Sequence, residues 1–217
     1  TLICFIWLRT LNNGRIAVAW LGLSSLFFYG YWNWAYLPLL IFSILINFAI
    51  GQRLCRRGSK KKFWIAIGVA FNISLLAYYK YSDFFISNLF SAWGQEFPSA
   101  ENIILPLAIS FFTFQQIAYL IAVYRDNAQP NNFLNYIAFV SFFPQLIAGP
   151  IVRKEELLPQ IAGISKKTTN YCLQSALVGL CLFVIGLFKK TVLADNFAIY
   201  SDSIFASASN GNSIGFV

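Results

Sequence analysis

The sequence predicts an all-α fold: a polytopic transmembrane helical bundle with broken or re-entrant helices and an interfacial amphipathic helix. Of its residues, 58% are hydrophobic and only 11% are charged, whereas a soluble domain averages roughly 25% charged residues. No charge occurs between Ile16 and Gln52, a stretch long enough for two membrane crossings of ~17–20 residues each. The apolar runs show neither the polar stripe of a soluble helix nor the alternation of a β-barrel strand, so both alternatives are disfavoured.

The first third of the chain is expected to cross the membrane repeatedly. Residues 2–8 have the composition of the end of a span. Further spans are expected over Ile16–Tyr31, Tyr36–Ile50 and Phe63–Tyr79. The aromatic run YGYWNW at 29–34 suits the headgroup level of a bilayer, where Trp and Tyr are enriched.

The distribution of basic residues predicts the orientation of these spans. Six Lys and Arg residues lie in the short connection 51–62, whereas residues 81–124 contain Asp and Glu but no Lys or Arg. Cytoplasmic loops of membrane proteins carry the excess of Lys and Arg. We therefore expect loop 51–62 to be cytoplasmic, and we attribute the net charge of +8 to this bias and not to nucleic-acid binding.

Residues 102–124 form an apolar run that contains polar side chains at membrane depth. Ser110, Thr113, Gln116 and Tyr119 recur at every third position, and Gln115 lies beside them. Polar amides are costly in hydrocarbon unless they find a partner or a water-filled cavity. Two interpretations stay open: hydrogen bonds that join helices, or the lining of a polar tunnel.

Residues 133–161 combine an interrupted apolar run with a cluster of charges. Pro144 is expected to interrupt the helix that begins at Phe133, and Gly149-Pro150 is expected to end it. The following segment, IVRKEELLPQI, has the pattern of an interfacial amphipathic helix. The alternative is an ordinary kinked span followed by a surface helix. Residues 168–188 are expected to form a further span, and the segment from Ala194 is expected to be a loop or a short surface helix.

Two segments carry a resemblance to a known family. PLAISFFTFQQIAYLIAVYRD at 106–126 and FVSFFPQLIAGPIVRKEELLPQ at 139–160 are similar to the membrane-bound O-acyltransferase family, in particular to its bacterial alginate O-acetylation and D-alanyl transfer branch. LFFYGYWNWAYLPLLIFSILINFAIG at 26–51 resembles the same branch, and the resemblance is collinear over essentially the whole chain. It implies transfer of an acyl group, expected to be acetyl, to hydroxyls of an extracytoplasmic polysaccharide or cell-wall polymer.

The resemblance also implies partners and a location. The acyl donor would be cytoplasmic, such as acetyl-CoA or an acyl carrier protein, and the protein would lie in the bacterial inner membrane as a multi-pass protein. Periplasmic acetyl-transfer proteins are implied as further partners. We expect no metal site and no bound cofactor, because the four cysteines have no metal-ligand spacing and the chain has no histidine.

The missing histidine bears on catalysis, because the resemblance implies a near-invariant histidine in a membrane-embedded helix. We expect residues 1–217 to be the N-terminal part of a single integral membrane acyltransferase domain that is incomplete at both ends, with the catalytic histidine beyond Val217; a degenerate homologue is the alternative. No catalytic residue is therefore assigned in this segment. The candidate substrate-binding residues are Ser110, Gln115, Gln116, Tyr119, Arg153 and Lys154.

Arg153 and Lys154 suit the phosphates of an acyl donor, since charge-assisted hydrogen bonds to phosphate are strong. The alternative is that Arg153 anchors the chain at the cytoplasmic surface or pairs with a neighbouring glutamate. Two other function classes also remain: a transporter or channel, to which broken helices with midplane polar residues are common, and a non-catalytic membrane scaffold for periplasmic transferases.

Overall fold

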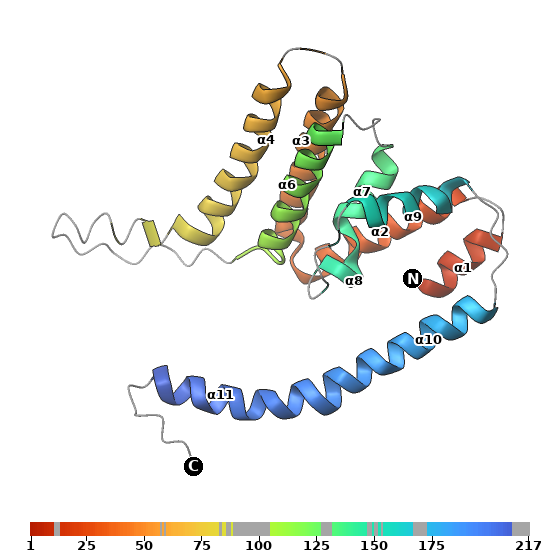
Figure 1. The fold of residues 1–217 in the computed structure, drawn as a ribbon, viewed down its shortest axis with the longest axis vertical. Helices are drawn as coiled ribbons and strands as arrows, with labels where there is room; N and C mark the ends of the chain where they lie inside the picture. Colours follow the sequence, from red (N-terminus) through yellow and green to blue (C-terminus); the bar gives the residue numbers. More distant parts are fainter. Residues whose placement is uncertain are drawn as a thin grey trace. The chain divides into compact units, whose positions relative to one another are not determined.

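The computed structural model describes residues 1–10, 14–56, 58, 60–82, 84–85, 88, 105–126, 132–146, 149, 152, 154–166 and 173–209. Every regular element among these residues is helical, so the predicted all-α class is confirmed (Figure 1). The chain divides into two compact units, 1–168 and 169–217. The α-helices described in the first unit are α1 (Leu2–Thr10), α2 (Gly14–Trp32), α3 (Leu37–Cys55), α4 (Lys61–Leu76), α6 (Ile109–Asp126), α7 (Phe133–Ser141), the four-residue α8 (Phe143–Leu146) and α9 (Lys154–Lys166).

Three of the described helical stretches are long and apolar enough to cross a membrane: Trp34–Cys55, Lys61–Tyr81 and Leu177–Ser207. The first two confirm the spans expected at 36–50 and 63–79. Helices α2 and α6 are 19 and 18 residues long. Their hydropathy is lower because α2 carries Arg15 besides Tyr, Trp and Ser, and α6 carries two glutamines and a charged end.

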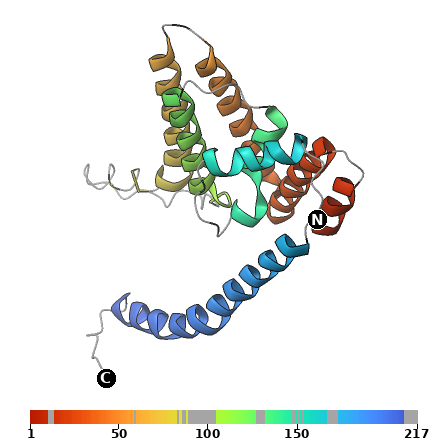
Figure 2. The same cartoon turned by 45° about the vertical axis from the view of Figure 1, so that its right-hand side comes forward.

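The first unit is built from two groups of helices. Helices α3, α4 and α6 pack side by side, and α2 packs against α7 and α9 (Figures 1 and 2). Gly68 of α4 permits the close approach within the first group, since a Cβ there would lie 2.5 Å from Leu120 Cδ1 of α6 and 3.3 Å from Ile50 Cγ2 of α3. Small residues serve helix packing in membranes in this way, because they let backbones come together.

The basic connection is shorter than the sequence predicts. Helix α3 continues to Cys55 and α4 begins at Lys61, so the non-helical part of the expected loop 51–62 lies between them. The extension is stabilised by packing, since Leu54 is fully buried and the Arg53 guanidinium carbon lies 5.5 Å from the centre of the Trp64 ring. A cation at this distance from an indole face is favourable.

The second unit is helical for longer than expected. Helix α10 (Leu173–Phe188) passes through a π-helical turn (Lys189–Ala194) into α11 (Asp195–Ser209). The π-turn brings residues five apart together, and Lys190 Nζ lies 2.7 Å from Asp195 Oδ2. The helix therefore does not stop behind Phe188, and most of the segment expected as a loop or short surface helix is α11.

Candidate functional site

Among the described residues, the helix that begins at Phe133 is interrupted at Phe142. Helix α7 ends at Ser141, Phe142 leaves the helical region with φ −51° and ψ 99°, and α8 begins at Phe143. The predicted interruption is present, but it lies at Phe142 and not at Pro144. Pro144 is placed in the first turn of α8, where its missing N–H removes no intrahelical bond.

Two side chains from other helices bind the backbone at this break. The Phe143 N–H donates to Ser25 Oγ of α2 over 3.3 Å, and Gln115 Nε2 of α6 donates to the Phe139 carbonyl over 3.2 Å. In an uninterrupted helix the Phe143 N–H would bond to the Phe139 carbonyl. Both groups of the missing bond are thus satisfied separately, as buried backbone groups require.

Gly149, which follows the end of α8 at Leu146, makes a close backbone contact. Its N–H donates to the Gln145 carbonyl over 3.0 Å. A Cβ at this position would lie 2.5 Å from Gln145 Cα and 2.7 Å from its carbonyl oxygen. Only glycine fits this approach, because the atoms that would clash are backbone. Pro150 lies outside the described residues.

The polar residues of α6 make contacts to other helices or to their own backbone. Gln116 Nε2 lies 3.2 Å from Ser43 Oγ of α3, and both residues are fully buried. Thr113 donates to the carbonyls of Ile109 and Ser110. These contacts agree with the first of the two interpretations, in which the polar side chains join helices.

Tyr119 and Ser110 complete the predicted stripe. The buried Tyr119 ring packs against Tyr136 of α7, with ring centres 4.6 Å apart. Gly51 of α3 accommodates it, since a Cβ there would lie 3.0 Å from the Tyr119 hydroxyl oxygen. Ser110 is half-buried. Neither of the two cavities described below is lined by an α6 residue, and a role of these side chains in substrate binding stays a prediction.

A second buried polar pair was missed by the sequence analysis. Asn47 of α3 and Asn72 of α4 exchange side-chain hydrogen bonds of 2.7 and 3.3 Å, and both are fully buried. Each amide also donates to the carbonyl four residues earlier. The available signal was a single asparagine inside each of two apolar runs, because an isolated amide in a span requires a partner.

Helix α9 confirms the predicted amphipathic segment. Leu158 and Ile161 are buried, whereas Glu155 and Glu156 are exposed. Lys154 is the first residue of the helix and is 9% exposed. Its Nζ lies 3.8 Å from Glu155 Oε1, which is longer than a charge-assisted hydrogen bond. Arg153 lies outside the described residues.

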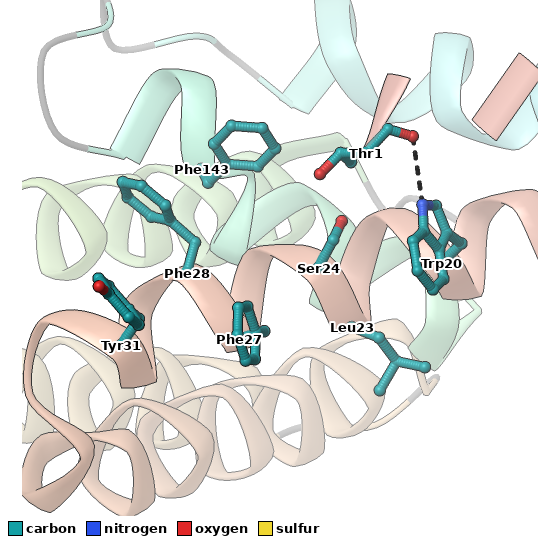
Figure 3. A pocket seen from close by; sticks show the side chains of 8 residues that line it. All are labelled: Thr1, Trp20, Leu23, Ser24, Phe27, Phe28, Tyr31 and Phe143. Atoms are coloured by element: carbon teal, nitrogen blue, oxygen red, sulfur yellow. Dashed lines mark hydrogen bonds between the residues drawn. The ribbon is translucent and has the colours of Figure 1, made fainter. Parts of the chain in front are cut away.

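Two cavities flank the break, and both are almost entirely apolar. The larger, of about 750 Å³, lies along α2 where the rings of Phe28 and Phe143 face each other and Trp20 Nε1 donates to the Thr1 carbonyl over 3.2 Å (Figure 3). The smaller, of about 310 Å³, lies among α1, α2, α7, α8 and α9. It is lined by Thr1, Leu2, Phe5, Leu21, Ala138, Phe142, Phe143, Pro144, Leu157, Gln160, Ile161 and Ile164.

Comparison with known proteins places this architecture in a family. Residues 107–217, which include α6, the break and α9, match the model of the membrane-bound O-acyltransferase family. The chain belongs to this family. The resemblance inferred from the segments 106–126 and 139–160 is thereby confirmed. The break at Phe142 and Gln115 lie within the matched residues, whereas Ser25 precedes them.

Several members of the family are similar to nearly the whole chain. A peptidoglycan O-acetyltransferase from Helicobacter pylori is 42% identical over 92% of this chain and 42% of its own length. Probable alginate O-acetylases from Pseudomonas putida and Pseudomonas aeruginosa are each 32% identical over 93% of this chain. The match covers 42% and 39% of their respective lengths, so the chain spans about two fifths of these relatives. No solved structure matches the chain.

Proposed function

We propose that this chain forms part of a membrane-embedded O-acyltransferase that moves an acetyl group from a cytoplasmic donor to hydroxyls of an extracytoplasmic cell-wall polymer. The observation that carries the proposal is the 42% identity, over 92% of the chain, to a protein named peptidoglycan O-acetyltransferase. Identity to the probable alginate O-acetylases is lower, at 32%, and for this reason peptidoglycan is the proposed acceptor. The bacterial inner membrane is the proposed location.

The chemistry of the reaction limits the role of the described residues. Acetyl transfer to a hydroxyl requires a base for the hydroxyl proton and hydrogen-bond donors for the developing oxyanion. The 217 residues contain no histidine, which is the commonest general base. We therefore assign this chain roles in binding and in positioning, and no step of proton transfer.

The entrance for the donor is proposed at the start of α9. Lys154 follows the break closely in sequence and has a largely buried side chain, so its charge is weakly screened by water. Together with the neighbouring Arg153 it would bind the phosphates of acetyl-CoA or of the prosthetic arm of an acyl carrier protein. Periplasmic acetyl-transfer proteins remain proposed partners.

The proposed function is tested by the acetyl content of the cell envelope. The gene is deleted, and base-labile acetate is measured on purified peptidoglycan and on the exopolysaccharide, with the full-length gene restored as the control. We expect acetate to fall on peptidoglycan and to return on restoration. A loss confined to the exopolysaccharide would contradict the proposed acceptor, and unchanged acetate on both polymers would contradict the transferase function.

A further inference from the structure

The break at Phe142 is held by two side chains that no known role of the chain explains. Ser25 accepts a hydrogen bond from the Phe143 N–H, and Gln115 donates one to the Phe139 carbonyl. Ser25 is fully buried and Gln115 is 7% exposed. The two bonds substitute for a single backbone bond, the one that an uninterrupted helix would form between Phe143 and Phe139.

The two side chains compete with a regular helix. The Ser25 hydroxyl donates to the Leu21 carbonyl over 2.7 Å, which orients an oxygen lone pair toward the Phe143 N–H. Without either partner, the two backbone groups would be left in a buried, apolar environment with each other as the nearest alternative. A continuous helix here would be kinked, because the Pro144 ring crowds the carbonyl of Val140 in the turn that this bond closes.

The two hydrogen bonds from Ser25 and Gln115, here called the clamp, determine the direction of the residues after the break. The smaller cavity is lined by Phe142, Phe143 and Pro144, together with Leu157 and Ile161 of α9. Closing the helix at Phe142 would redirect α8 (Phe143–Leu146). The contacts that set this direction come from α2 and α6, which are distant in sequence from the break.

We propose that Ser25 and Gln115 are positioning residues, which hold the break open and thereby orient α8 (Phe143–Leu146) for acyl transfer. This inference rests on the proposed function for its effect on the reaction. The clamp itself rests only on the two hydrogen bonds and on the burial of the groups that make them.

The test compares Ser25→Ala, Gln115→Leu and the double variant in the full-length protein. Each single variant leaves one buried backbone group without its partner, and we expect the ratio of folded to unfolded protein in detergent to fall about five- to 150-fold. In the double variant the Phe143 N–H and the Phe139 carbonyl can bond to each other. Its loss should therefore be clearly smaller than the product of the two single losses.

Two further measurements separate positioning from stability. Amide hydrogen exchange over residues 133–146 should rise in Ser25→Ala and return toward the wild-type value in the double variant. Acetyl transfer per folded molecule should fall at least tenfold in all three variants, because each loses a hydrogen bond that orients α8. The double variant regains a continuous helix, but this helix runs in a different direction. Asn72→Leu is the matched control. It removes a buried amide elsewhere, so it should lower stability without changing exchange at the break or transfer per folded molecule.

The outcomes are distinct. Losses in the double variant that equal the product of the single losses would overturn the clamp. Wild-type transfer per folded molecule in all three variants would overturn the positioning role. If the wild-type protein transfers no acetyl group, the proposed function is wrong and the positioning role is wrong with it, while the unfolding and exchange data still judge the clamp.

Discussion

The contact between Ser43 of α3 and Gln116 of α6 predicts unequal costs for removing its two partners. Ser43→Ala leaves the buried Gln116 amide without its partner at 3.2 Å, and an orphaned buried polar group costs about 1–3 kcal/mol. Gln116→Leu removes the amide and leaves only a hydroxyl. That hydroxyl can donate to the Leu39 carbonyl four residues earlier, as Ser25 donates to Leu21 over 2.7 Å. We therefore expect Gln116→Leu to cost only about 0–1 kcal/mol.

Equilibrium unfolding of the full-length protein in detergent micelles measures these costs, with the double variant completing the cycle. The double variant should be close to Gln116→Leu alone, because the amide that Ser43→Ala orphans is no longer present. Acetyl transfer per folded molecule should stay at the wild-type value in Gln116→Leu, since the contact joins two helices.

Either of two results would refute this reasoning. A larger cost for Gln116→Leu than for Ser43→Ala would show that the amide has a more important partner than the serine hydroxyl. Loss of transfer in Gln116→Leu at wild-type stability and abundance would show that Gln116 lines the path of a substrate, which is the other interpretation that the sequence allows.

Three further predictions concern the break, the donor entrance and the topology. Gly149→Ala should cost more than about 2 kcal/mol of stability, because the new Cβ would lie 2.5 Å from the Gln145 backbone. Gly163→Ala in α9 is the control: this glycine has open space around it, so the change should be neutral or gain up to about 1 kcal/mol. Equal effects of the two variants in the same unfolding assay would contradict the contact. Lys154→Gln should raise the KM for the acetyl donor about ten- to 100-fold, and an unchanged KM would exclude Lys154 from donor binding. In a variant with no other cysteine, Cys55 should react with an impermeant thiol reagent only after the cells are permeabilised. Labelling of intact cells would show that the predicted orientation is inverted.

The amino-acid sequence alone determined the fold class and the family. Long runs without charge indicate membrane helices because hydrocarbon offers no hydrogen bonds, so the backbone must satisfy itself within each segment. The spans over Trp34–Cys55 and Lys61–Tyr81 follow directly from this requirement. The family could be recognised because PLAISFFTFQQ and FFPQLIAGP are each an uninterrupted stretch of the chain. Such motifs can be recognised without knowledge of tertiary contacts.

Element ends were harder to predict, because packing extends helices beyond the local signal. Basic residues at 53–62 suggested a loop, yet α3 continues to Cys55. Leu54 is buried and the Arg53 side chain lies over Trp64, and the contacts that stabilise this last turn involve residues of another helix. Likewise, two basic residues behind Phe188 suggested the end of a span, whereas the π-turn lets Lys190 pair with Asp195 and the helix continues.

Only the tertiary structure decided where the helix after Phe133 breaks and what the polar side chains bind. Pro144 indicated a break nearby, since proline cannot donate to the preceding turn. Its position at Phe142 depends on the hydroxyl of Ser25, which accepts from the N–H of Phe143, 118 residues away in the chain, and on the amide of Gln115. The same holds for Gln116, because burial in apolar surroundings requires a partner but does not specify which one. That partner, Ser43, becomes available only when α3 and α6 pack together.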